Sequence, residues 1–336
     1  MVKARRWVLK HHFAGSPKKE DFDLVEEELP EVKDGEFMYR SLFISVDPYQ
    51  RPYTDRIPAS AFPITMMGSS VAVVEKSKNK DFPEGSEVLI YGGWTERGIC
   101  NPDGKAVSNI SKPWVYPKIP GVSSSMMLGA CGMPGNTAYF GFLRLCEPKA
   151  GDTVVVSGAA GAVGSIVGQI AKIKGCKVIG FAGNDEKVEW LKTLGFDHVY
   201  NYKKKEVPDA LKEAAPEGVD CYFDNVGGFM SIHVLEHMRH RGRVAVCGAI
   251  SGYNSERDNK YPETLRLTIA KEIRIEGLHI SRWAAEFQQG SRDLADWITR
   301  GDIKVRETIV EGFEKTPKAF FGLFDGSNTG KMIVKV

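Results

Sequence analysis

Between residues 123 and 300, short apolar runs alternate with segments of helical periodicity. The clearest run, 154–156, consists of three valines, and their β-branched side chains predict a short buried strand. The alternation continues with predicted strands at 177–181, 197–200, 219–224 and 242–247 and predicted helices at 185–194, 208–214 and 228–239. Strands and helices at this spacing form a parallel sheet with both faces covered, so we expect an α/β, doubly wound Rossmann domain.

The chain on either side of this region has a different pattern. Short β-type runs between turn-forming residues, clearest at 37–46, 70–74 and 87–91, predict a small, mainly β, barrel-like domain. After residue 300 the pattern predicts a strand at 304–310, a helix at 316–325 and a final strand at 330–336 that fits the first domain's sheet. We therefore expect a domain of residues 1–122, completed by 301–336, with the Rossmann domain of residues 123–300 inserted between the two parts.

A run of small residues follows the strand at 154–156. It has the spacing Ala159-x-Gly161-x-x-Gly164 and leads into an apolar helix pattern. Gly161 lets the backbone approach a phosphate, and Gly164 lets the helix pack close to the strand. Backbone N–H groups at the start of such a helix lie at the positive end of its dipole, where a pyrophosphate binds. A close-packed turn without a ligand is the alternative, but the strands before and after favour a dinucleotide site.

The tip of the second strand indicates which dinucleotide binds. NAD-binding domains carry an acid about 20 residues past the glycine motif, where it accepts hydrogen bonds from the adenosine ribose. Here the strand ends at Ala182 without an acid, and Asp185 fits better as the N-terminal acid of the next helix. Lys187, in that helix's first turn, and Tyr202 could contact a 2′-phosphate. The missing acid predicts NADP more strongly than Lys187 does, because a solvated helix lysine is common.

Two further segments lie where parallel strands end. Residues 224–228 end the fourth strand and residues 247–253 end the fifth. Ligands of such sheets bind beyond the carboxyl ends of the strands, so we expect both segments to line the nicotinamide half of the site. In the first domain, a proline-fixed turn at 46–51 carries Tyr49 and Arg51. The sequence leaves open whether this is a surface turn or a wall of the substrate cleft.

Composition narrows the function further. The formal net charge of +2 gives no reason to expect nucleic acid or an anionic membrane as a partner. No apolar run reaches the length of a membrane span, and the first residues lack the apolar core of a signal peptide. The six cysteines are scattered through apolar segments without the spacing of a zinc site. We therefore expect buried thiols, no metal and a cytoplasmic location.

Several motifs make the chain similar to a known family. They are Val-Asp-Pro-Tyr at 46–49, Gly-Met-Pro-Gly at 132–135, the glycine-rich turn at 158–168, Cys-Tyr-Phe-Asp-Asn-Val-Gly-Gly at 221–228, Cys-Gly-Ala-Ile-Ser at 247–251 and Asn-x-Gly-Lys at 328–331. In this order, and over nearly the whole chain, they resemble the zinc-independent medium-chain dehydrogenase/reductases. The resemblance implies a GroES-like first domain and a Rossmann second domain, and a homodimer is an assembly compatible with it.

The resemblance also implies a cofactor site and an activity. By position it assigns NADP(H) binding to Gly161, Ala162, Val163, Gly164, Lys187, Tyr202, Asn225, Cys247, Gly248, Ala249, Ile250, Ser251, Gly252, Tyr253, Leu278, His279, Ile280 and Asn328. The implied reaction is reduction of the carbon–carbon double bond of α,β-unsaturated carbonyl compounds. The implied substrates are 15-oxo-prostaglandins, alkenals and alkenones, with oxidation of leukotriene B4 at its 12-hydroxyl as an additional activity.

This chemistry requires no metal. A hydride adds to the β-carbon of the enone, and negative charge moves to the carbonyl oxygen as an enolate. Hydrogen-bond donors stabilise that charge, and a proton then reaches the α-carbon. Relatives that oxidise alcohols carry a zinc-ligating Gly-His-Glu, but the corresponding residues 67–71 of this chain read Met-Gly-Ser-Ser-Val.

The chain departs from the family near the expected substrate mouth. Ser281 precedes Arg282 and Trp283 where relatives often have a tyrosine, and residues 254–260 form a short charged segment in place of a proline-rich one. Tyr253 and Tyr49 are therefore the candidate catalytic donors to the enolate oxygen. We prefer Tyr253 because it follows a segment expected to flank the nicotinamide. For either ring, apolar packing with a solvated hydroxyl is the alternative.

Two other functions remain open at the level of sequence. An NADPH quinone reductase of the same superfamily would keep the whole cofactor site and differ only in its acceptor. A non-catalytic, crystallin-like protein would bind NADPH without turning over any enone.

Overall fold

The computed structural model describes residues 2–104, 112–255 and 265–336, which form two compact units. The first unit comprises residues 1–129, 307–328 and 332–336, and the second unit comprises residues 130–306 and 329–331. The domain boundaries predicted from the sequence lie at 122/123 and 300/301. The observed units divide a few residues later at both places, at 129/130 and 306/307.

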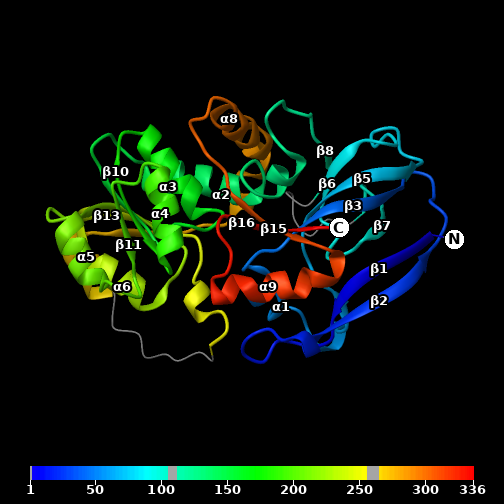
Figure 1. The fold of residues 1–336 in the computed structure, drawn as a ribbon, viewed down its shortest axis with the longest axis horizontal. Coiled ribbons are helices and arrows are strands. Elements are labelled where there is room, and N and C mark those ends of the chain that lie inside the picture. The colour runs from blue at the N-terminus through cyan, green and yellow to red at the C-terminus, as the bar shows by residue number, and fades with distance from the viewer. Residues whose placement is uncertain (1, 105–111, 256–264) are drawn as a thin grey trace. The chain divides into compact units, whose positions relative to one another are not determined.

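Two sheets make up most of the first unit (Figure 1). The smaller sheet has the order β2 (Phe22–Leu29), β1 (Val2–Leu9), β4 (Ile64–Thr65). The larger sheet has the order β15 (Glu307–Glu311), β16 (Lys331–Lys335), β3 (Phe37–Ser45), β5 (Ser70–Ser77), β6 (Glu87–Ile90), β8 (Trp114–Val115), and β7 (Arg97–Cys100) pairs with β3. The last strand, β16, is antiparallel to β3, with Ile333 opposite Ser45.

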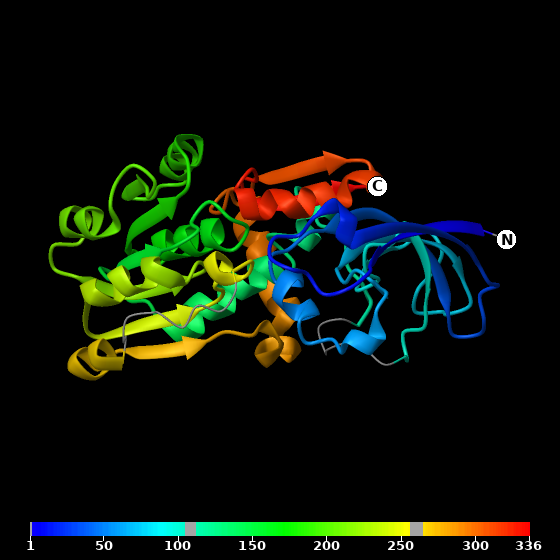
Figure 2. The same ribbon diagram turned by 90° about the horizontal axis from the view of Figure 1, so that it is seen from below.

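Helix α9 (Thr316–Asp325) contributes apolar side chains to the core of the first unit. Phe320 belongs to the same buried cluster as Leu9 and Phe22, and its ring meets that of Trp94 edge-on with centroids 5.5 Å apart. Figures 1 and 2 show α9, in red, beside the blue N-terminal strands. Residues near both ends of the chain therefore bury one common core.

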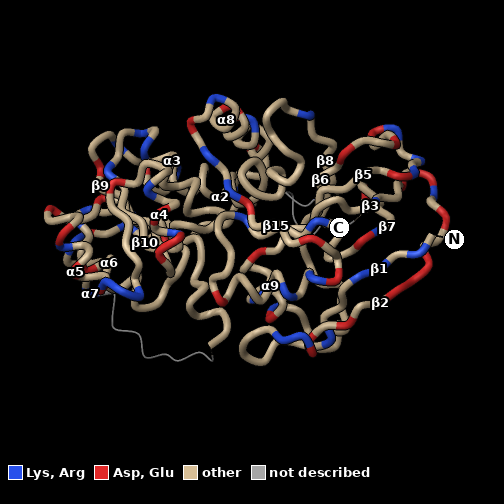
Figure 3. The backbone as a smooth tube through the Cα atoms, viewed as in Figure 1, with Lys and Arg blue, Asp and Glu red and all other residues tan. Residues whose placement is uncertain are grey.

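Ion pairs link the outer sides of β1 and β2. Lys3 contacts Glu26 at 2.8 Å, and Arg6 contacts Glu27 at 3.0 Å. Figure 3 shows basic residues along β1 opposite acidic residues along β2. Exposed pairs of this kind contribute at most about 1 kcal/mol each. They favour the correct strand register more than they stabilise the unit.

The second unit is built on a six-stranded sheet in which every pairing between neighbours is parallel. Its order is β11 (His198–Asn201), β10 (Lys177–Ala182), β9 (Thr153–Val156), β12 (Val219–Asp224), β13 (Met238–Val246), β14 (Arg274–Gly277). The order reverses between β9 and β12, which is the switch point of a doubly wound sheet. The predicted α/β Rossmann class is confirmed.

Helices flank this sheet on both sides (Figures 1 and 2). They are α2 (Met133–Phe140), α3 (Gly164–Ile173), α4 (Asp185–Thr193), α5 (Val207–Ala214), α6 (Gly228–His237), α7 (Leu265–Lys271) and α8 (Phe287–Thr299). Glycines set the close approach of α3 to β10. A Cβ atom on Gly168 would lie 1.9 Å from the Phe196 ring, and one on Gly180 would lie 2.8 Å from it. The Phe196 ring fills the space that these two glycines leave.

The structure corrects several predicted boundaries in the second unit. Helix α6 ends at His237 and not at 239, and β13 begins at Met238 and not at 242. The reason is that Met238 already pairs with Val219 of β12, before a register shift in the ladder. Helix α7, strand β14 and helix α8 are not among the elements predicted from the sequence. Among the described residues, no helix combines the length and apolar character required to cross a membrane.

Candidate dinucleotide site

The turn after β9 has the tight geometry that its glycines predict. All four residues of β9 are buried, and Gly158 adopts a left-handed conformation with φ of 58°. The Gly161 N–H donates to the Gly158 carbonyl oxygen at 3.0 Å. A Cβ atom on Gly164 would lie 2.5 Å from that same oxygen, so position 164 accepts only glycine without rearrangement.

Helix α3 begins directly at this turn. Its first backbone hydrogen bond joins the Ser165 N–H to the Gly161 carbonyl oxygen at 3.1 Å. The N–H groups of Ala162, Val163 and Gly164 precede that bond, at the positive end of the helix dipole. The four predicted phosphate-binding residues thus lie together at a helix start suited to an anion.

A segment distant in sequence supports the turn from outside. The Gly330 N–H donates to the Ala160 carbonyl oxygen at 2.8 Å, and Gly330 forms a parallel bridge with Gly161. A Cβ atom on Gly330 would lie 1.9 Å from the Arg306 carbonyl oxygen, so this contact also requires glycine. In the sequence Gly330 is recognisable only as part of a motif, and no local pattern predicts this support. Asn328, a predicted cofactor residue, belongs to the first unit.

The strand tip at Ala182 leads into a capped helix. The Asn184 side-chain oxygen accepts the Lys187 N–H at 2.9 Å, which makes Asn184 the N-cap of α4. Asp185 lies in the first turn of α4, as predicted. Hydrogen bonds from Lys204 and Asn201 lower the pKa of its carboxyl group. The Asp185 carboxylate is therefore engaged within the protein at its own helix end.

Lys187 and Tyr202 lie at this same edge. A Cβ atom on Gly183 would lie 3.1 Å from the Tyr202 hydroxyl oxygen, so the absence of a side chain at 183 leaves room for the phenol. Tyr202 is 44% exposed, and Lys187 is half-buried. Together with the N-terminus of α4, they offer a lysine ammonium, a phenol and a helix dipole to an anion.

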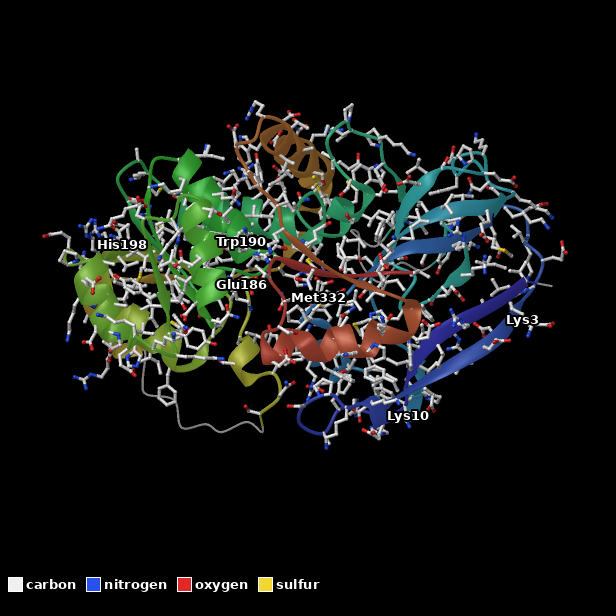
Figure 4. All side chains as sticks on the ribbon, in the orientation of Figure 1. Lys3, Lys10, Glu186, Trp190, His198 and Met332 are labelled. Atoms are coloured by element: carbon white, nitrogen blue, oxygen red, sulfur yellow. The ribbon has the colours of Figure 1, made fainter. Side chains whose placement is uncertain are left out.

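The outer side of α4 is held by one arginine. The Arg306 guanidinium contacts Glu186 at 2.8 Å and lies over the Trp190 ring at 5.8 Å. Figure 4 shows Glu186 and Trp190 along this helix. The backbone of Arg306 also accepts the Lys331 N–H at 3.1 Å. Arg306 thus connects α4 to the segment that supports the phosphate turn.

A buried carboxylate organises the loop after β12. One oxygen of Asp224 accepts hydrogen bonds from the Ser157 hydroxyl at 2.9 Å and from the N–H groups of Val226 and Gly227, both at 2.9 Å. It also accepts the Tyr222 hydroxyl at 2.8 Å, and the other oxygen accepts the Ser231 hydroxyl. These bonds connect the ends of β9 and β12 to the start of α6. Sequence reasoning named Asp224 only as a strand end.

Burial and the Asp224 carboxylate raise the pKa of two neighbouring groups. Burial and the Asp224 charge raise the pKa of the Tyr222 hydroxyl well above its ordinary value. Burial raises the pKa of the Cys247 thiol to about 12, with Asp224 adding to the effect. Both groups therefore stay protonated, and Cys247 contributes an inert side chain to the site.

The predicted nicotinamide-side segments meet around Asn225. Its side-chain amide donates to the Ser157 carbonyl oxygen at 2.8 Å, and its own carbonyl oxygen accepts the Ile250 N–H at 3.4 Å. The Cys247 N–H donates to the Asp224 carbonyl oxygen at 2.8 Å. The loops after β12 and β13 therefore form one continuous hydrogen-bonded surface at the carboxyl edge.

Tyr253 folds back onto its own loop. Its hydroxyl oxygen accepts the Ala249 N–H at 3.2 Å, and a Cβ atom on Gly248 would lie 3.1 Å from that oxygen. The charged segment that follows extends beyond the described residues, because 256–264 are outside them.

Tyr49 lies in the first unit, at the N-cap of α1 (Gln50–Thr54). Its hydroxyl oxygen is 3.3 Å from that of Tyr91, and burial raises the pKa of Tyr49 well above its ordinary value.

Arg51 fits neither of the two predicted alternatives, a surface turn or a wall of the substrate cleft. Its side chain is buried, contacts Asp55 at 2.8 Å and lies over the Phe13 ring at 5.1 Å. Arg51 therefore stabilises the first unit from inside.

The part of the chain that the structure describes contains no cluster of three or more His, Cys, Asp or Glu side chains arranged to hold a metal ion. All six cysteines are free thiols.

Known proteins resemble this chain in sequence and in fold. A family profile described as zinc-binding dehydrogenase matches residues 162–297, and one described as the N-terminal domain of oxidoreductase matches residues 5–110. Prostaglandin reductase 1 from Bos taurus is 49% identical over 337 residues, which cover 100% of both chains. The NADP-dependent 2-alkenal reductase of Nicotiana tabacum is 38% identical, over 100% of this chain and 98% of its own. The crystal structure of CurA from Vibrio vulnificus in complex with NADPH is 37% identical, covers 99% of both chains and superimposes with a TM-score of 0.90.

Proposed function

Because this chain belongs to the prostaglandin reductase 1 family of medium-chain dehydrogenase/reductases, we propose that it is an NADPH-dependent reductase of α,β-unsaturated carbonyl compounds. The single observation that carries the proposal is the arrangement of residues at the carboxyl edge of the parallel sheet in the second unit. There a glycine turn at a helix start, an acid-free strand tip and a neighbouring lysine form a site suited to NADPH.

The residues present fit this cofactor in three parts. The N–H groups of 162–164 would hold the pyrophosphate, Gly161 would let the backbone approach it, and Lys187 with Tyr202 would hold the 2′-phosphate. Asn225, residues 247–253 and residues 278–280 would flank the nicotinamide, and the family resemblance adds Asn328 to the set. Support comes from the N-cap geometry at Asn184 and from a relative of 37% identity that binds NADPH. When bound, the cofactor supplies a hydride.

The protein's part in the chemistry is to stabilise the enolate oxygen. We assign this role first to Tyr253. Its oxygen accepts the Ala249 N–H, so the hydroxyl proton is directed away from Ala249, and the bond polarises the phenol as a donor. Tyr49 is the second candidate. Its buried hydroxyl stays protonated, because its pKa is raised, and a protonated phenol can donate to an oxyanion.

The substrate class follows from the relatives. Their names, a prostaglandin reductase and a 2-alkenal reductase, support prostaglandins and alkenals as the substrate classes of this chain. Within these classes we propose 15-oxo-prostaglandins, with leukotriene B4 as a substrate for the reverse, oxidative direction, as the family resemblance implies. The test is steady-state NADPH oxidation with a 15-oxo-prostaglandin, a medium-chain alkenone and a small quinone side by side. Turnover of the enones with clearly lower activity on the quinone supports the proposal. Preference for the quinone would favour a quinone reductase, and NADPH binding without any turnover would favour the non-catalytic alternative.

Two further parts of the proposal concern assembly and location. We propose a homodimer, supported by β14, the last strand in the order of the described sheet, with Ile275 exposed along it. Light scattering on the protein as it elutes from a size-exclusion column would measure the mass of the assembly. We also propose a cytoplasmic location, supported by the free thiols, and imaging of a fluorescent fusion would test it.

A further inference from the structure

A histidine and a serine lie just beyond the carboxyl end of β14. Gly277, the last residue of β14, is opposite Val246 of β13. The next residue, Leu278, donates its N–H to the Val246 carbonyl oxygen at 2.9 Å. His279 is therefore the second residue past the strand, beside the segment that follows β13. This is the edge at which doubly wound sheets bind their ligands.

The backbone sets the direction in which these side chains point. His279 is extended, with φ of −132° and ψ of 120°, so its neighbours on either side point the opposite way. Ile280 is buried. The Leu278 side chain packs against Gly141, because a Cβ atom on Gly141 would lie 2.4 Å from it. His279 points to the other side, and Ser281 follows it in the 3-10 helix Ile280–Glu286. His279 is exposed, and its Nδ1 atom is in hydrogen-bond contact with the Ser281 hydroxyl.

None of the other six histidines of the chain follows the carboxyl end of a strand in this sheet. His11 and His12 belong to the first unit, His198 begins β11, His233 and His237 are in α6, and His240 is near the start of β13. Next to His279, Arg282 is paired with Glu276 and stacks on the Trp283 ring. The imidazole is thus a group at this edge that can both release and accept a proton.

We propose that His279 and Ser281 form the proton-donating pair for enone reduction at this site, an inference that rests on the function proposed above. After hydride addition to the β-carbon, the Ser281 hydroxyl proton moves to the enolate oxygen. The proton on His279 Nδ1 then moves to Ser281, and water reprotonates the exposed imidazole. The resulting enol tautomerises, forming the C–H bond at the α-carbon while its O–H proton returns to water. One hydride and one proton are consumed, as the overall reduction requires.

The test compares His279→Gln and Ser281→Ala with Ser281→Thr, which keeps the hydroxyl. His198→Gln is the matched control, since it makes the same substitution at the amino end of β11. We expect the first two variants to lose about 10- to 100-fold in kcat on an alkenone. We expect Ser281→Thr to retain more activity than Ser281→Ala, because it keeps a hydroxyl, and His198→Gln to stay close to wild type.

Isotope effects separate proton donation from a structural role. In His279→Gln, protonation becomes the slow step. The ratio of the rates with NADPH and with its 4-deuterated form should therefore fall toward unity. The ratio of the rates in H2O and in D2O should grow. A readout without turnover is the binding of p-nitrophenolate, an enolate mimic, to the complex with NADP+. Its dissociation constant should rise in both His279→Gln and Ser281→Ala.

Three results would overturn the inference. Wild-type kcat and isotope effects in both variants, with normal enone reduction by the parent enzyme, would refute the pair and leave the proposed function intact. A kcat loss without any change in isotope effects or phenolate binding would assign the two residues a structural role. A parent enzyme that reduces no enone would overturn both proposals. If His279→Gln does not fold, His279→Asn and the phenolate measurement on Ser281→Ala provide the same comparison.

Discussion

A Cβ atom on Gly164 would lie 2.5 Å from the carbonyl oxygen of Gly158 and 2.9 Å from the Cα atom of Ala159. Both contacts are with backbone, and the Gly158 oxygen is already fixed by the Gly161 N–H. No side-chain rotation can relieve them. The phosphate turn therefore depends on glycine at this position for packing, independently of any cofactor.

We expect Gly164→Ala to lower the free energy of unfolding by about 1–3 kcal/mol, because the new methyl group displaces the turn. The dissociation constant for NADPH should rise by at least 10-fold, because a loss of about 1.4 kcal/mol of binding free energy is enough for a factor of ten. Chemical denaturation and cofactor fluorescence measure the two effects. Gly277→Ala is the control, because nothing lies within 4 Å of a Cβ atom there. Equal behaviour of the two variants would contradict the packing argument.

Lys187 should discriminate between the two nicotinamide cofactors. We expect Lys187→Ala to raise the KM for NADPH by about 10-fold and to leave that for NADH nearly unchanged, since only NADPH carries the 2′-phosphate. Lys192→Ala removes a lysine from the last turn of the same helix, where it pairs with Glu189 at 2.6 Å, and should affect neither cofactor. Steady-state kinetics with both cofactors provides the comparison. A parallel loss with NADPH and NADH would show that Lys187 does not contact the phosphate.

Activity should not depend on a metal ion. Hydride transfer to an enone leaves charge on one oxygen, and hydrogen-bond donors suffice to stabilise it. We expect full activity after exhaustive dialysis against a chelator and no stoichiometric zinc in elemental analysis. Loss of activity to the chelator, reversed by added zinc, would refute this expectation.

The parts of the fold that sequence predicts best are those with strong local signals. The strand at 219–224 was placed at its observed ends because five of its residues are buried and its sides are covered by helices. The phosphate turn was recognisable because its glycines and the flanking strand are adjacent in sequence. By contrast, β14 is a short strand with an exposed pattern and carries no apolar run, so no periodicity marked it.

The parts of the site that sequence missed depend on contacts between distant residues. Asp224 binds Ser157 from 67 positions away. Gly330 reaches Ala160 from the far end of the chain, and nothing in either segment identifies the other. The same holds for Tyr91, whose hydroxyl lies beside that of Tyr49 although 42 positions separate them. Local patterns specify the elements, whereas these pairings appear only when the sheets are assembled.

Asp224 should be essential to the loop that it organises. Asp224→Asn keeps the size of the side chain but replaces an acceptor oxygen with an N–H donor among groups that already donate. We expect the free energy of unfolding to fall by about 3 kcal/mol, because bonds to a buried charge are strong. NADPH affinity should fall as well, since Asn225 and residues 247–253 lose their alignment. Asp209→Asn, on the exposed side of α5, is the control. An unchanged unfolding midpoint would argue that the network contributes little.

The Tyr253 hydroxyl has either a catalytic or a purely structural role, and one substitution distinguishes the two. If its hydroxyl donates to the enolate oxygen, Tyr253→Phe should lower kcat by about 100-fold, because one oxyanion donor contributes on the order of 3 kcal/mol. The KM for NADPH should change little. If instead the hydroxyl serves only to accept the Ala249 N–H, the same variant should lower the melting temperature slightly and leave kcat unchanged.

Tyr49→Phe provides the comparison, because Tyr49 belongs to the first unit and its hydroxyl has Tyr91 as a neighbour. Single-turnover rates for both variants on one alkenone, with melting temperatures measured in parallel, assign the donor. A large loss in Tyr253→Phe alone supports our first choice. A large loss in Tyr49→Phe alone assigns the role to Tyr49. Wild-type rates in both would leave the Ser281 hydroxyl as the donor at the enolate oxygen, which the substitutions at 281 then test directly.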